Sequence, residues 1–104
     1  MRLKDGVDLV GLRREMREAF GAIDRTHQAL ADREATITST TEGRHSVKRS
    51  AHYRGDAVDV RTWHVDGEKF KSALVDALGP DYVVILESDH MHVHWGPVFD
   101  GEPA

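Results

Sequence analysis

Hydrophobic residues at steps of three and four predict two amphipathic helices. The first is expected from about Asp8 to Ala31, with Asp8 capping its first turn. Its apolar face consists of Leu9, Leu12, Met16, Phe20, Ile23, His27 and Leu30. His27 is better interpreted as a partly buried, hydrogen-bonded histidine than as a metal ligand. The second helix is expected from Gly67 to Leu78, after Asp66 as its cap and before Gly79-Pro80.

Four short segments rich in β-branched or alternating residues predict strands. They are 35–40, 57–62, 82–86 and 91–95. Period-two alternation places Val58 and Val60 on one face of their strand and Asp59 on the other. In the last strand the same alternation turns three histidines onto one face, namely His90, His92 and His94. The order of elements predicts an α+β domain with a small, mostly antiparallel sheet and two flanking helices.

The composition indicates one domain spanning residues 1–104, with 39% hydrophobic and 31% charged residues. A formal net charge of -4 argues against nucleic acid or an acidic membrane as a partner. The sequence has no cysteine, which excludes disulfides and thiolate zinc sites. Because no segment has the apolar length of a signal peptide or a membrane span, we expect a protein made in the cytoplasm.

The histidines and acids form two clusters that together predict a zinc site. One cluster holds His52 and Asp59, and the other is the run from Glu87 to His94. Imidazole and carboxylate groups are suitable zinc ligands, and a catalytic zinc takes three of them from the protein. If the strands that carry Asp59 and His92 are neighbours, His52 in the preceding loop can complete the set. A surface strand with fortuitous histidines is the less favoured alternative.

Two motifs resemble those of the zinc D-Ala-D-Ala peptidase family. They are Ser50-x-His52-x-x-Gly55-x-Ala57-x-Asp59 and His90-x-His92. That family includes phage L-alanyl-D-glutamate endolysins and shares its fold with the Hedgehog signalling domain. The similarity extends over about residues 37–95, most of the chain. It implies a Hedgehog-like fold and one Zn²⁺ per chain.

Carried over position by position, the resemblance implies that His52, Asp59 and His92 are the zinc ligands. It places His90 beside the metal as a hydrogen-bonding group. His45 resembles a family histidine upstream of the first ligand, with a spacing one residue longer, and it or Arg44 could hold a developing oxyanion. His94 lies beyond the family pattern, and an edge-strand surface histidine is as good an interpretation of it as a role in the site.

Two carboxylates are candidates for the general base. Asp89, three residues before His92, matches the peptidases of the family, and Glu87, five before, is near the glutamate of the Hedgehog-like branch, so Asp89 is slightly favoured. Arg61, on the face of Asp59, could bind a substrate carboxylate, although simple solvation explains Arg61 and Arg44 equally well. Ser50 is expected to hydrogen-bond substrate or to order its loop.

These features predict a zinc metallopeptidase that hydrolyses peptide bonds of bacterial peptidoglycan. Both an L-Ala-D-Glu endopeptidase and a D-Ala-D-Ala carboxypeptidase fit, with the small size favouring the endopeptidase, in a phage lysis enzyme or a wall-remodelling hydrolase. The substrate would then be reached by export, lysis or a virion. The alternative is a zinc-binding interaction module of the same fold with weak or no catalysis. A metal-dependent nuclease fits the acidic charge balance poorly.

Overall fold

A computed structural model describes residues 1–40 and 55–96 of the chain. In chain order, the elements within these residues are β1 (Arg2–Leu3), α1 (Arg14–Ala31), β2 (Thr36–Ser39), β3 (Ala57–Arg61), α2 (Gly67–Leu78), β4 (Tyr82–Leu86) and β5 (His90–Trp95). The strands form one sheet in the order β1-β2-β3-β5-β4. The β1–β2 pair is parallel, and the β2–β3, β3–β5 and β4–β5 pairs are antiparallel. The α+β class expected from the sequence is therefore confirmed.

The second helix lies where the sequence places it. The Asp66 carboxylate accepts a hydrogen bond from the backbone N–H of Lys69 at 3.2 Å, which satisfies one of the first-turn donors. At the other end, Gly79 adopts a φ of 82° and its N–H reaches the carbonyl of Val75. A glycine adopts a positive φ without strain, so the helix ends there.

The first helix begins later than expected, at Arg14 instead of Asp8. The Asp8 carboxylate accepts from the N–H of Val10, two residues on, and so closes a local turn that is not helical. Gly11 has a φ of 83°, and the N–H of Arg13 donates to the carbonyl of Gly55 at 2.9 Å. This contact with a distant segment holds residues 11–13 out of the helix, and the predicted cap at Asp8 is wrong.

The strand β1 was not expected from the sequence. Arg2 pairs with Thr36 and Leu3 with Ile37, yet both β1 residues are exposed. A two-residue exposed strand carries no alternation of hydrophobic and polar residues to reveal it. Its pairing depends on β2, which lies more than thirty residues later in the chain.

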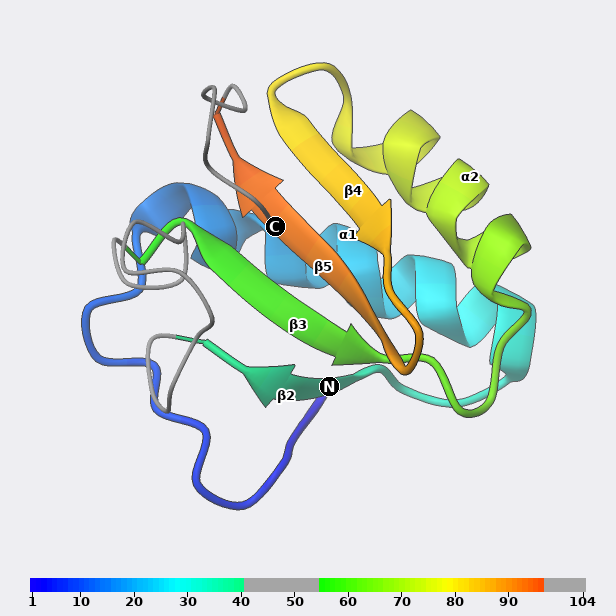
Figure 1. Cartoon of the computed structure of the whole chain (residues 1–104), viewed down its shortest axis with the longest axis horizontal. Coiled ribbons are helices and arrows are strands. Elements are labelled where there is room, and N and C mark those ends of the chain that lie inside the picture. The colour runs from blue at the N-terminus through cyan, green and yellow to red at the C-terminus, as the bar shows by residue number, and fades with distance from the viewer. Residues whose placement is uncertain (41–54, 97–104) are drawn as a thin grey trace.

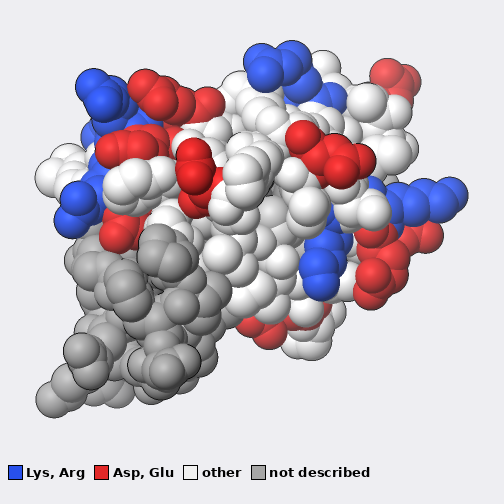
Figure 2. Space-filling view, turned by 90° about the horizontal axis from the view of Figure 1, so that it is seen from above, with Lys and Arg blue, Asp and Glu red and all other residues white. Residues whose placement is uncertain are grey.

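The surface carries charges of both signs. On the face seen from above, acidic and basic side chains are interspersed around a largely uncharged middle area (Figure 2). No helix in the described part of the chain has the length and apolar character needed to cross a membrane.

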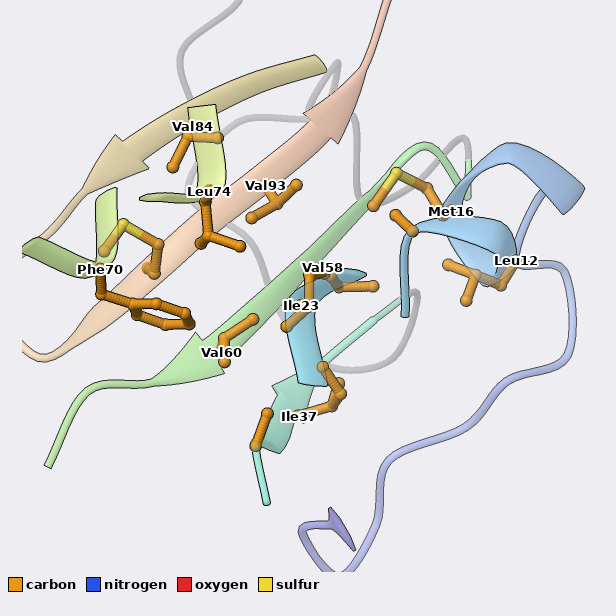
Figure 3. Packing of buried hydrophobic residues seen from close by; sticks show 13 residues of the cluster. Leu12, Met16, Ile23, Ile37, Val58, Val60, Phe70, Leu74, Val84 and Val93 are labelled. Carbon is orange, nitrogen blue, oxygen red and sulfur yellow. The ribbon is translucent and has the colours of Figure 1, made fainter. Parts of the chain in front are cut away.

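One hydrophobic core joins the two helices to the sheet. Helix α1 crosses behind the strands and α2 runs along β4 (Figure 1). Side chains from both helices meet the strands in this layer (Figure 3). The core residues that are fully shielded from solvent are Met16, Ile23, Ala35, Ile37, Val58, Val60, Phe70, Leu74, Met91 and Val93. Each large side chain buried in this way contributes on the order of 1.5–3 kcal/mol to folding. Burial of Val58, Val60, Met91 and Val93 fixes which face of β3 and β5 points away from the core.

Candidate metal and acid–base site

Asp59 and His92 lie directly opposite each other on the neighbouring strands β3 and β5. The same register pairs Arg61 with His90 and Ala57 with His94. These residues alternate with the buried valines and Met91, so they occupy the sheet face that points away from the core. Figure 1 shows the two strands side by side over most of their length. The strand adjacency on which the predicted site depends is therefore present.

The carboxylate of Asp59 lies between two imidazole rings. Its Oδ1 atom is 3.3 Å from Nδ1 of His92 and 3.7 Å from Nε2 of His90. On the far side of His90, Nδ1 lies 2.6 Å from Oδ1 of Asp89, so an N–H there donates to that carboxylate. The contacts thus form a chain in which acids and histidines alternate, in the order Asp89, His90, Asp59 and His92.

His92 is only 1% exposed and is held from both ring nitrogens. While its Nδ1–H faces Asp59, its Nε2 lies 2.8 Å from Nδ1 of His94, and the rings meet edge to face with centroids 5.0 Å apart. A buried imidazole bonded at both nitrogens has a fixed orientation. Such a ring is prepared to present one nitrogen to a ligand without reorganising.

The structure contradicts one of the two interpretations that the sequence allowed for His94. It is 5% exposed and lies on β5, which has β3 on one side and β4 on the other. The interpretation as a surface histidine on an edge strand is wrong. His94 instead supports the orientation of the His92 ring.

A hollow of about 190 Å³ opens beside Asp59. We call it the Asp59 hollow. Its walls are Lys4, Thr38, Asp59, Arg61, Trp63, Asp89 and His90. Asp89 is exposed and lines this hollow, whereas the half-buried Glu87 is not among its walls. The backbone N–H of Glu87 donates to the carbonyl of His90 and closes the turn between β4 and β5. Of the two candidate bases, Asp89 is the one that faces the hollow.

Arg61 is held by an aromatic ring that the sequence-based prediction did not include. Its guanidinium carbon lies 3.8 Å from the centre of the Trp63 ring, and Trp63 is 69% exposed. A cation–π contact of this kind orients the guanidinium plane. The signal in the sequence was the bulky aromatic two residues after Arg61, just beyond the strand. Lys4 gave no comparable signal, because β1 brings it to the hollow through a long-range pairing.

The donor set at Asp59 and His92 fits zinc. Two ligands of a tetrahedral zinc, each bound at about 2.0–2.1 Å, lie roughly 3.3–3.4 Å apart. The 3.3 Å between Asp59 Oδ1 and His92 Nδ1 agrees with that separation. If Nδ1 of His92 bound the cation, the ring proton would reside on Nε2 and donate to Nδ1 of His94, an orientation that the observed contact already provides.

The described residues do not complete a metal site alone. Within residues 1–40 and 55–96, no three His, Asp or Glu side chains group closely enough to hold a metal ion. The third predicted ligand, His52, lies outside the described residues, as do Arg44, His45 and Ser50. The structure thus brings together Asp59, His92, His90, Asp89 and Arg61, and the placement of the other four is not described.

No protein-family model, curated protein or solved structure matches this chain.

Proposed function

We propose that the chain is a zinc-dependent peptidase that hydrolyses peptide bonds in the stem peptides of bacterial peptidoglycan. The observation that carries the proposal is the Asp59–His92 pair, at the ligand-to-ligand distance of zinc, beside a hollow that contains a carboxylate–histidine pair. His52, with the two motifs that resemble the zinc D-Ala-D-Ala peptidases, supplies the third ligand in this proposal. We also propose that this chain has the Hedgehog-like topology of that family.

A zinc ion bound by His52, Asp59 and His92 would polarise the scissile carbonyl and acidify water at neutral pH. Asp89 acts as the general base: its carboxylate takes a proton from the attacking water and passes it to the leaving amine. The water oxygen forms the new bond to the carbonyl carbon, and the bond from that carbon to nitrogen breaks. His90 holds Asp89 through the 2.6 Å contact and so fixes the direction of the carboxylate.

The basic residues of the hollow position the substrate. Arg61, oriented by Trp63, and Lys4 present positive charge next to Asp59. Both are suited to a substrate carboxylate or to the oxyanion that develops on the scissile carbonyl. In this proposal His45, Arg44 and Ser50 contribute from the segment that precedes β3 in the sequence, with His45 or Arg44 at the oxyanion.

The test is digestion of purified peptidoglycan by the zinc-loaded full chain, followed by mass spectrometry of the released fragments. New L-alanine carboxyl ends would identify an L-Ala-D-Glu endopeptidase, and released D-alanine a D-Ala-D-Ala carboxypeptidase. The matched control is the same protein after zinc removal with a chelator. Bound zinc without any cleavage would overturn the peptidase proposal and favour a zinc-binding interaction module.

A further inference from the structure

A second hollow, distinct from the Asp59 hollow, lies at one end of the sheet. It has a volume of about 340 Å³, and its walls include Arg2, Arg33 and Arg61; we call it the arginine pocket. Figure 1 shows that α1 ends, β2 begins and β3 ends at this end of the molecule. The two hollows share Arg61 as a common wall.

The arginine pocket carries an excess of positive charge. Against the three guanidinium groups stands one carboxylate in its lining, that of Glu34. Oε2 of Glu34 lies 3.5 Å from the amine of Met1, so another cation already faces it. This accumulation contrasts with the interspersed acids and bases on the face in Figure 2. Concave surfaces lined with one sign of charge concentrate ligands of the opposite sign.

One guanidinium nitrogen of the pocket is buried without a partner. Nε of Arg61 is shielded from solvent and makes no hydrogen bond within the described part of the chain. The guanidinium is nevertheless held in place by Trp63 at 3.8 Å. Buried N–H groups are nearly always hydrogen-bonded, so the Nε–H of Arg61 is a donor that the described residues leave without an acceptor.

Two further contacts hold the pocket in shape. His27, 2% exposed, donates from Nδ1–H to the carbonyl of Arg33 at 2.8 Å and packs edge-on against Phe70. This confirms the interpretation of His27 as a buried, hydrogen-bonded histidine, and it fixes the backbone that carries Arg33. Arg2 is anchored by the pairing of β1 with β2, where it lies opposite Thr36. Arg2 and Arg61 therefore lie on paired strands, and Arg33 lies on a bend whose carbonyl is held by His27.

His64 lines the arginine pocket, and its pKa is affected by loss of hydration and by the neighbouring charges. Desolvation, together with the neighbouring Arg33, His27 and Arg61, lowers the pKa of the His64 imidazole. Loss of hydration disfavours the protonated ring most, and the positive charge of Arg33 and Arg61 adds to this effect. An anion among the same groups would act in the opposite direction.

We infer that the arginine pocket binds an oxyanion group, phosphate or carboxylate, of a small ligand. Guanidinium groups pair with both through parallel N–H bonds. The volume of about 340 Å³ falls within the roughly 300–1,000 Å³ of small-molecule sites and exceeds the need of a single bare ion. The inference requires neither bound zinc nor peptidase activity, although Arg61 is a wall of both hollows.

The experiment is an NMR titration of the metal-free full chain with inorganic phosphate and, in a second arm, with succinate, both at constant ionic strength set by chloride. Saturable shifts at Arg33 and His64, with a rise in the pKa of His64, are expected in at least one arm. The arm that saturates at the lower concentration identifies the class of ligand.

The charge-removing variant Arg33→Gln tests whether the pocket is the site. It should weaken binding by about tenfold, since one charge-assisted contact is lost. Arg14→Gln removes the same charge at the opposite, exposed end of α1 and should leave the affinity unchanged. Shifts that rise linearly in both arms and match those of chloride would overturn the inference. So would an affinity that Arg33→Gln leaves equal to that of the unmodified protein.

Discussion

One oxygen of the Asp59 carboxylate faces both His92 and His90, so this side chain links the two histidines. Alternation in β3 and β5 was enough to predict that these three residues share a sheet face. The rotamers that turn both rings toward the same oxygen were not predictable, because they depend on contacts across two strands. The same holds for the contact between His92 and His94, which required knowledge that β5 is an internal strand.

Removal of either proposed zinc ligand in the described residues should abolish metal binding. His92→Gln and Asp59→Asn are each expected to lower the zinc content from about one per chain to near zero, because two remaining protein ligands hold zinc weakly. His64→Gln removes a histidine outside the proposed site and should retain zinc. Metal analysis after gel filtration, with circular dichroism as a check of folding, measures this. Full zinc occupancy in a folded His92→Gln protein would contradict the ligand assignment.

Substitutions of Asp89 and Glu87, the two candidate bases, form a matched pair. Asp89→Asn should retain zinc and lose on the order of 10²–10⁴-fold in the rate of hydrolysis, the usual contribution of a general base. The rate for Glu87→Gln should stay within a few fold of that of the unmodified protein, because Glu87 does not line the Asp59 hollow. Rates measured on the same peptidoglycan fragment decide between them. The reverse ranking would reassign the base to Glu87.

At the scale of elements, local signals predicted α2 and the three strands β3, β4 and β5 closely. Capping by Asp66, termination at Gly79 and strict alternation are all properties of neighbouring residues. The start of α1 and the strand β1 depend instead on pairing with segments far along the chain. Apolar periodicity through Leu9 and Leu12 continued past the true helix start, because those residues pack against the core from a non-helical segment.

Gly55 joins the segment before α1 to the start of β3, and its replacement should be costly. A Cβ atom there would overlap the carbonyl oxygen of Gly11 and come within 3.1 Å of its carbon, and the φ of 77° disfavours any side chain. Gly6 has a similar φ of 92° but open space around it. Gly6→Ala should therefore cost roughly 1–2 kcal/mol from the backbone conformation alone. Gly55→Ala should exceed that value in urea unfolding, and equal losses for the two would refute the packing argument.

The Asp24 side chain connects α1 to the residue just before β2. The stability that this contact gives to the fold should depend on pH. Burial by itself would raise the pKa of Asp24, but the hydrogen bond from the Ala35 N–H, the Met1 amine and Gln28 together lower it. A lowered pKa means that the stabilisation is present above the ordinary value of 3.8 and is lost as the pH falls through the folded value.

The corresponding substitution is Asp24→Asn, with Asp76→Asn on the exposed side of α2 as the control. The free energy of unfolding of Asp24→Asn should lie below that of the unmodified protein at pH 7, and the two should converge below pH 3.8. Denaturant unfolding at a series of pH values measures the difference. A difference that stays constant down to the acid limit would show that the Asp24 charge does not contribute.

At the scale of the whole molecule, the fold separates a core layer from a polar layer. The helices, with α1 behind the strands in Figure 1, and the inward side chains of the sheet form the core. The opposite face of β3 and β5 carries Asp59 and the three histidines. The coarse α+β class was predictable because both helices and the strands β2 to β5 carry local signals in the sequence. The two hollows were not predictable from the sequence, because they form where residues from β1, β2 and β3 converge.

The central claim is that one zinc ion, held in part by Asp59 and His92, supports peptide hydrolysis. Its most direct test is a titration of metal-free full chain with zinc while the rate of cleavage of a peptidoglycan stem peptide is followed. We expect no cleavage without metal and a rate that rises linearly and levels off at one zinc per chain. Cleavage that persists at full rate after complete zinc removal, or none at any zinc level in a folded protein, would contradict the account.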